Sequence, residues 1–215
     1  MCWSATADLV AGSAITAVGV ACVARAARTR PRALPLAALP LLLGAHQIIE
    51  AVIWNDNGGR GPAVLAWAVI ALPLLPFWVP AGVLCVARPE ARRRLWPLLA
   101  CGLVTSAALA YTLATRTVTA TVRGHTMAYE IGLPHAGLLV AGYLLATIGS
   151  LLLSGEAGLV LLGGLAGIAA AVCAALWRWE FVSTWCAAAA VCSLVLFAWT
   201  RRAAATPTNS SGGPP

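Results

Sequence analysis

Residues 33–54 read ALPLAALPLLLGAHQIIEAVIW, and this stretch decides the class of the protein. A helix needs roughly 20 consecutive apolar residues to cross the hydrocarbon core of a membrane. The stretch reaches that length with Glu50 as its one charged residue, and the turn-like sequence Asn55-Asp56-Asn57-Gly58-Gly59 follows it. We therefore predict a membrane-spanning helix that ends near Trp54.

Apolar runs of similar length recur along the whole chain. Of its 215 residues, 60% are apolar and 10% are charged, whereas a soluble domain carries roughly 25% charged residues. The runs predict seven helices, at about Ala5–Ala24, Ala33–Trp54, Ala63–Ala87, Leu95–Ala114, His135–Leu153, Ala157–Leu176 and Phe181–Trp199. We expect an all-α integral membrane protein in which residues 1–202 form a seven-transmembrane-helix bundle and residues 203–215 form a disordered cytoplasmic tail.

The basic residues indicate how the bundle is oriented. All 14 are Arg, and they lie at the ends of the apolar runs rather than in a stripe, which argues against a nucleic-acid partner. The absence of Lys excludes a retinal Schiff base, and with it a rhodopsin. If the N-terminus is outside, ten Arg fall on the inner side and four on the outer side. The positive-inside rule therefore predicts a multi-pass protein of the cell membrane with the C-terminus in the cytoplasm and the lipid bilayer as its partner.

The connection between the fourth and fifth helices carries a strand pattern. Apolar and polar residues alternate over residues 117–122 and again over residues 127–131, and Arg123-Gly124 interrupts them. This pattern predicts a two-strand hairpin. The topology places it outside, as a cap over the bundle.

Ionisable residues inside a membrane span are costly, so they are candidates for function. His46 and Glu50 are four residues apart and share one helix face, which Trp54 continues. The predicted topology brings all three His and most of the acids to the outer half. Apart from these three positions, the outer candidates are Asp8, His125, His135, Tyr129, Cys2 and Cys186.

Three functions fit these residues, and each stays open at this point. One is a metal site for zinc or copper built from His46, Glu50, His125 and Cys186. A second is a membrane enzyme that uses Glu50 as its acid/base. A third is an outward-facing pocket for a small solute or lipid, as in a transporter or sensor. A purely structural polar cluster competes with all three, because outer polar residues can simply hydrogen-bond neighbouring helices or water. The enzyme motifs HExxH, GxSxG and GxGxxG are missing from the sequence.

The chain also resembles a family of uncharacterised bacterial multi-pass membrane proteins that begin Met-Cys-Phe/Trp-Ser-Ala. The resemblance rests on Met1-Cys2-Trp3-Ser4-Ala5, LPLLLGAHQIIEAVIW at residues 39–54, FWVP at residues 77–80, GHTMAY at residues 124–129 and STWC at residues 183–186. It implies a compact multi-helix membrane protein without an established activity.

The positions that match and depart from this family rank the candidates. The family commonly has Gln where this chain has His46 and a small polar residue where it has Asp8, which favours Glu50, His125, Cys2 and Cys186 over His46. Tyr129 and Trp54 also match. We therefore expect an outward-facing polar pocket around Glu50, under the hairpin, that binds a metal or a small ligand.

Overall fold

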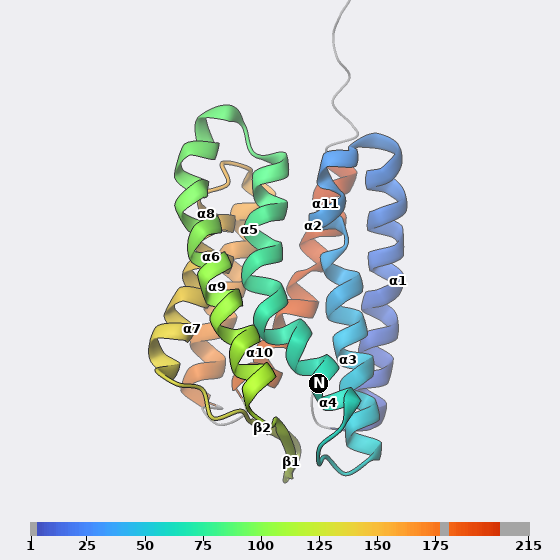
Figure 1. Ribbon diagram of the computed structural model, residues 1–215. Helices are drawn as coiled ribbons and strands as arrows, with labels where there is room; N and C mark the ends of the chain where they lie inside the picture. The colour runs from blue at the N-terminus through green and yellow to red at the C-terminus, as the bar shows by residue number, and fades with distance from the viewer. Residues whose placement is uncertain (1–3, 177–180, 203–215) are drawn as a thin grey trace, which may run out of the picture.

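A computed structural model describes residues 4–176 and 181–202, which fold into a bundle of roughly parallel and antiparallel helices with a hairpin at one end (Figure 1). The first helix is α1 (Ala5–Thr29), and the fourth is α6 (Pro89–Thr115). The sixth is α9 (Ala157–Leu176), and the seventh consists of α10 (Phe181–Cys192) and α11 (Leu194–Arg202). The predicted tail at residues 203–215 lies outside the described residues, as does Cys2.

Prolines divide the second and third helices into pieces. The second consists of the 3₁₀ turn η1 (Pro31–Ala33), α2 (Leu34–Ala37) and α3 (Leu39–Asn55). The third consists of α4 (Pro62–Val69), the π-helical turn η2 (Ile70–Leu74) and α5 (Leu75–Val86). Proline has no N–H with which to continue the helical ladder, and Pro40 and Pro73 lie at these interruptions.

The fifth helix is the shortest of the seven. It consists of α7 (Ala136–Leu144), a second π-helical turn η3 (Leu145–Gly149) and α8 (Ser150–Leu152). Within the described residues, six helices are long and apolar enough to cross a membrane, and Ala136–Leu152 falls short of that length. The predicted seven helices are therefore present, six of them with spanning length.

The predicted hairpin is confirmed. Strand β1 (Thr119–Arg123) pairs antiparallel with β2 (Thr126–Glu130), so that Ala120 lies opposite Tyr129. Gly124 has a φ of 60°, a conformation that costs glycine little and that a two-residue hairpin turn needs. The strands begin two residues later than the alternation starts, at Thr119 instead of Thr117.

Helices α1 and α3 make the most extensive contact between two helices of the described residues, and small residues make it possible. A Cβ on Gly12 would lie 2.9 Å from the Gly44 carbonyl oxygen, and one on Gly19 would lie 2.6 Å from the Leu41 nitrogen. Only residues without a side chain allow backbones to approach so closely. This contact fixes the position of α3, which carries the candidate residues.

The two ends of the bundle differ in charge. The hairpin lies at one end, and the α1–η1, α5–α6 and α8–α9 connections lie at the other (Figure 1). The Arg-rich segments gather at this second end, where Glu156 lies 4.0 Å from both Arg30 and Arg88. The sequence-based grouping of Arg on one side is therefore confirmed, whereas the direction in which the bundle faces remains a prediction.

Candidate functional site

The candidate site lies on α3, toward the hairpin end of the bundle. His46, Gln47 and Glu50 are completely buried there, as is Asp8 on the neighbouring helix α1. Residues three and four positions apart share a helix face. Glu50 therefore lies on the same face as His46 and Gln47, one helical turn nearer the hairpin end. The acidic, amide and imidazole side chains that are buried among the described residues are therefore these four, whereas the other buried polar residues are Ser and Thr.

Trp67 of α4 contacts two of these side chains and the hairpin. Its indole Nε1 donates a hydrogen bond of 3.3 Å to the Glu50 carboxylate oxygen Oε2. One face of its ring lies 4.7 Å from the His46 ring, between centroids. Tyr129 of β2 stacks on the indole at 3.4 Å with an angle of 8° between the planes. Trp67 thus connects the carboxylate to the hairpin.

The hairpin is fastened to the α3–α4 connection. Gly59 and Ala120 exchange two backbone hydrogen bonds of 2.7 and 2.9 Å, and Arg60 donates from Nε to the Thr119 hydroxyl at 2.9 Å. Gly58 has a φ of 80°, and a Cβ at this position would lie 2.5 Å from the Ala120 carbonyl oxygen. The hairpin is therefore attached through the loop that directly follows α3, and Tyr129 reaches Trp67 from it.

Hydrogen bonding is incomplete at His46 and Gln47, and the indole N–H of Trp54 also has no partner among the described residues. Among the described residues, neither ring nitrogen of His46 and neither polar atom of the Gln47 amide has a hydrogen-bond partner. A buried polar group without a partner costs about 1–3 kcal/mol, and most such groups in proteins do have one. His46 and Gln47 therefore offer hydrogen-bonding positions that a buried water molecule or a polar ligand could fill.

The structure brings some of the predicted residues together and separates others. Cys186 of α10 is buried, and α10 packs against α3, the helix that carries Glu50. Trp54 is half-buried one turn above Glu50. His125 is exposed in the hairpin turn, about 13 Å along the strand from Tyr129 at roughly 3.3 Å per residue. His135 is also exposed, at the start of α7.

The four residues predicted to bind zinc or copper do not form a compact set. Within the described residues, no group of three or more His, Cys, Asp and Glu side chains is arranged to hold a metal ion. His125 is exposed in the hairpin turn, whereas His46, Glu50 and Cys186 are buried. The pair His46–Glu50 remains together on α3.

The sequence pattern did not identify Trp67 as part of the site. Most other Trp residues lie near helix ends, where interfacial anchors are common, but Trp67 lies inside the third apolar run. A buried indole N–H needs a hydrogen-bond acceptor. A Trp in the middle of an apolar run therefore indicates a polar partner on a neighbouring helix. Gln47 lies in the same apolar stretch as Glu50, but an unsatisfied amide has no signal in the sequence.

Comparison with known proteins places the chain in a family without assigning it an activity. No curated protein and no solved structure matches it. The model of a family of unknown function, DUF6629, matches residues 1–211, nearly the whole chain. The chain therefore belongs to the family of unknown function DUF6629.

Proposed function

We propose that this chain is a multi-pass membrane protein that binds an amine-bearing ligand at Glu50, from the outer side of the membrane and beneath the hairpin. The observation that carries the proposal is the unsatisfied hydrogen-bonding capacity of His46 and Gln47 next to a buried carboxylate. Separate observations support the placement in a membrane, the side of the membrane that the site faces and the chemical class of the ligand.

Helix length and surface composition support the membrane. Six helices of at least 18 residues have the length and apolar character of membrane spans. Their outward faces carry large apolar side chains, for example Val104 at 71% exposure on α6, and Leu138 on α7 is 75% exposed. Water would not tolerate such a surface over a whole molecule, whereas lipid would.

The distribution of Arg supports the outer side. The end opposite the hairpin carries ten of the 14 Arg, and cytoplasmic ends of membrane proteins carry the excess of basic residues. The hairpin and Glu50 would then face the outside. A ligand would reach the site without crossing the membrane.

The chemistry of the site supports a polar ligand with a positive charge. A neutral imidazole and an amide each need both a donor and an acceptor, which a group such as ethanolamine supplies. The carboxylate of Glu50 favours a cation, and the faces of Trp67 and Tyr129 attract one through cation–π interaction. Because all these side chains are buried or half-buried, the ligand would enter when the hairpin moves aside.

Thermal unfolding of the detergent-purified protein tests the proposal. We expect ethanolamine to raise the melting temperature of the wild type, because a ligand at ten times its Kd stabilises the folded state by about 1.4 kcal/mol. Ethylene glycol, which lacks the charge, is the matched neutral compound. The Glu50→Gln variant should lose the response to ethanolamine.

The control variant is Glu130→Gln, which removes the same charge from an exposed hairpin position that pairs with Arg123 at 3.2 Å. This variant should keep the response. Equal stabilisation of wild type and Glu50→Gln, or no stabilisation of the wild type by ethanolamine, would overturn the proposal.

A further inference from the structure

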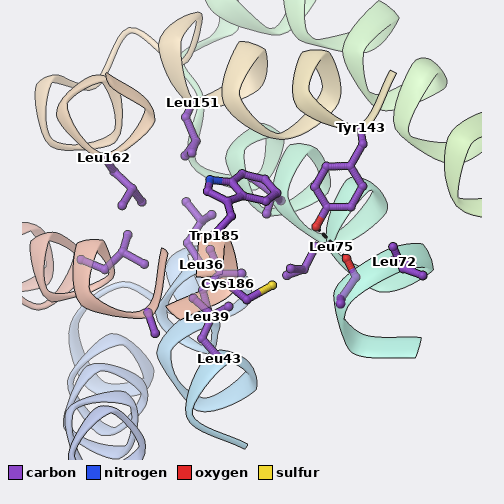
Figure 2. Close-up of a cluster of buried hydrophobic side chains, with 14 of the residues drawn as sticks. Leu36, Leu39, Leu43, Leu72, Leu75, Tyr143, Leu151, Leu162, Trp185 and Cys186 are labelled. Atoms are coloured by element: carbon purple, nitrogen blue, oxygen red, sulfur yellow. Dashed lines mark hydrogen bonds between the residues drawn. The ribbon is translucent and has the colours of Figure 1, made fainter. Parts of the chain in front are cut away.

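The Arg-rich end of the bundle lies far from the polar group on α3. Arg30 directly precedes the second helix, and Glu50 follows it by 20 residues, which is roughly 30 Å at about 1.5 Å per residue. The core between these two levels is mainly apolar, as Figure 2 shows for the leucines of α2, α3 and α5 around Trp185. The dashed contact in Figure 2 joins the Tyr143 hydroxyl to the Ala71 carbonyl at 2.8 Å, so this polar atom is bonded within the core. The Arg-rich end is therefore an independent feature of the molecule.

Arg30 and Arg88 come from different connections of the chain and meet at one acid. Arg30 lies between α1 and η1, and Arg88 lies between α5 and α6. The atoms Arg30 Nη2 and Arg88 Nε are each 4.0 Å from the same carboxylate oxygen, Oε1 of Glu156, in the connection between α8 and α9. The two nitrogens are therefore no more than twice that distance apart, and one negative charge faces two positive charges.

Arg94 of α6 brings a third guanidinium group to the same connection. Its Nε donates to the Leu153 carbonyl at 2.8 Å. Its Nη2 lies beside Gly155, 3.3 Å from the position that a Cβ would take there, and Gly155 directly precedes Glu156. Three Arg from three segments, Arg30, Arg88 and Arg94, therefore gather around residues 153–156. We refer to these three residues as the Arg cluster.

The guanidinium groups of the Arg cluster are positioned in ways that leave N–H donors for a ligand. A hydrogen bond has an N···O distance of about 2.7–3.2 Å, so the two 4.0 Å contacts with Glu156 are charge pairs without a hydrogen bond. Arg30 lies over the ring of Trp199, with Cζ 5.2 Å from the centroid. A guanidinium that stacks on an aromatic face still presents N–H groups in its own plane. The side chain of Arg88 is 74% exposed, so its donors face the solvent.

The excess of positive charge extends beyond the Arg cluster. The connections and helix ends on this side carry ten Arg, but Glu90 and Glu156 are their only acids in the sequence. Charges of one sign that lie close together raise the local concentration of counter-ions. A ligand with a negative charge is therefore favoured at this end, whereas a cation is favoured at Glu50.

The chemistry of Arg indicates which anion fits. A guanidinium group presents its N–H donors in a planar fork that matches two oxygens of a phosphate. All 14 basic residues of the chain are Arg, although Lys would satisfy the positive-inside rule as well. In the proposed placement this end lies at the inner surface of the membrane, where anionic lipids present their phosphates and basic pockets between helices bind them. A phospholipid headgroup is therefore the anion that this surface meets at the highest concentration.

From these contacts we infer that the Arg cluster binds the headgroup of an anionic phospholipid of the inner leaflet, with the phosphate held by Arg30, Arg88 and Arg94. Glu156 keeps Arg30 and Arg88 together and neutralises one of the three positive charges, so a net charge of two remains for the phosphate. The inference uses the membrane placement of the proposed function but not the ligand at Glu50. It gives the Arg-rich end a binding role in addition to its role in topology.

Native mass spectrometry of the detergent-purified protein tests the inference. The protein is mixed with equal amounts of dioleoyl-phosphatidylglycerol and dioleoyl-phosphatidylcholine, and the lipid molecules that stay bound are identified by mass. The two lipids have the same acyl chains and both contain a phosphate, but the choline group neutralises the second one. We expect the wild type to retain phosphatidylglycerol in preference to phosphatidylcholine. Equal retention of the two lipids would overturn the inference.

Two double variants provide a matched comparison. The variant Arg30→Gln/Arg88→Gln removes two charges from the Arg cluster, and Arg28→Gln/Arg93→Gln removes two charges from exposed positions nearby. Retention of phosphatidylglycerol should fall about tenfold in the first variant, because two partly exposed contacts with the phosphate are lost. It should change by less than about twofold in the second variant. An equal loss in both would mean that only the total charge matters, and it would overturn the site.

A third variant tests whether the planar fork is needed. Arg30→Lys/Arg88→Lys keeps both charges but replaces each fork by a single ammonium group. The preference for phosphatidylglycerol should fall in this variant as well. Retention at the wild-type level would overturn the assignment of the phosphate to the guanidinium groups.

The source of the phosphate and the relation to Glu50 are tested separately. Glycerophosphoglycerol, the same headgroup without acyl chains, should not displace phosphatidylglycerol at equal concentration. Displacement would mean that the Arg cluster binds a soluble phosphate compound, and it would overturn the lipid inference. Glu50→Gln should retain phosphatidylglycerol like the wild type. If ethanolamine fails to stabilise the wild type while this retention persists, the proposed ligand at Glu50 fails and the inference about the Arg cluster stands.

Discussion

Replacement of Trp67 by Phe removes one hydrogen bond and keeps most of an aromatic stack. The indole N–H donates to Glu50 at 3.3 Å, while the ring contacts His46 and Tyr129. Hydrogen bonds to charged groups contribute about 1.5–3 kcal/mol, and polar contacts between membrane helices average about 0.6 with a maximum near about 1.7 kcal/mol. Because this bond is long, at 3.3 Å, we assign about 1–2 kcal/mol to its loss.

The smaller ring adds a second cost. An aromatic pair contributes about 0.5–1.5 kcal/mol beyond its buried area, and the phenyl ring of the variant would keep only part of the overlap with Tyr129. We therefore expect Trp67→Phe to lower the free energy of unfolding by about 1.5–3 kcal/mol. The measurement is SDS-induced unfolding in mixed micelles, followed by circular dichroism.

Trp96→Phe is the control, because Trp96 is 58% exposed on α6 and surface substitutions usually stay within about 0.5 kcal/mol. A double-mutant cycle of Trp67→Phe with Glu50→Gln isolates the contact between the two side chains, and we expect a coupling of about 1 kcal/mol. The role given to Trp67 would be refuted if Trp67→Phe lowered the free energy of unfolding no more than Trp96→Phe does, within error. A coupling energy near zero in the double-mutant cycle would refute it as well.

Three further predictions concern the hairpin, the metal and the topology. Gly58→Ala should destabilise the protein by about 1–2 kcal/mol more than Gly59→Ala. Both positions have a positive φ, but only at Gly58 would a Cβ meet the Ala120 carbonyl. Thermal unfolding of the two variants measures the difference. If zinc or copper binds, elemental analysis should find stoichiometric metal that Glu50→Gln loses and His125→Ala retains, because His125 is exposed in the turn. In a variant whose seven native Cys are replaced by Ser, a Cys introduced at His125 should react with a membrane-impermeant maleimide added to intact cells, and no reaction would reverse the predicted orientation.

The helices and the hairpin could be predicted because each depends on a local pattern. Apolar runs marked all seven helices, and strict alternation marked both strands. The boundaries were less accurate where a helix continues beyond the apolar run: α6 begins at Pro89 and includes three Arg, while the run begins at Leu95. Hydropathy identifies only the segment that lipid can cover, whereas the backbone hydrogen bonds of the helix continue beyond that segment.

The candidate site was predictable only within one helix. The spacing of His46 and Glu50 placed both on one face, and the structure has them there. Contacts between elements have no such local signal, so Trp67 was missed. His125 was expected near Glu50 because it lies on the same side of the bundle. A strand advances about 3.3 Å per residue, however, so the four residues from Tyr129 to His125 take it away from the site.

The depth of Glu50 in α3 has an electrical consequence. Five residues separate it from the end of the helix at Asn55, or roughly 7 Å of a hydrocarbon core about 30 Å thick. A cation that moves from the outer solution to Glu50 would therefore cross about a quarter of the membrane potential. At about 2.3 kcal/mol per charge per 100 mV, an inside-negative potential of that size would favour its binding by about 0.6 kcal/mol. Occupancy of the site would then depend on the membrane potential. The affinity for the cation would be roughly two to three times higher at about 100 mV, inside negative, than without a potential.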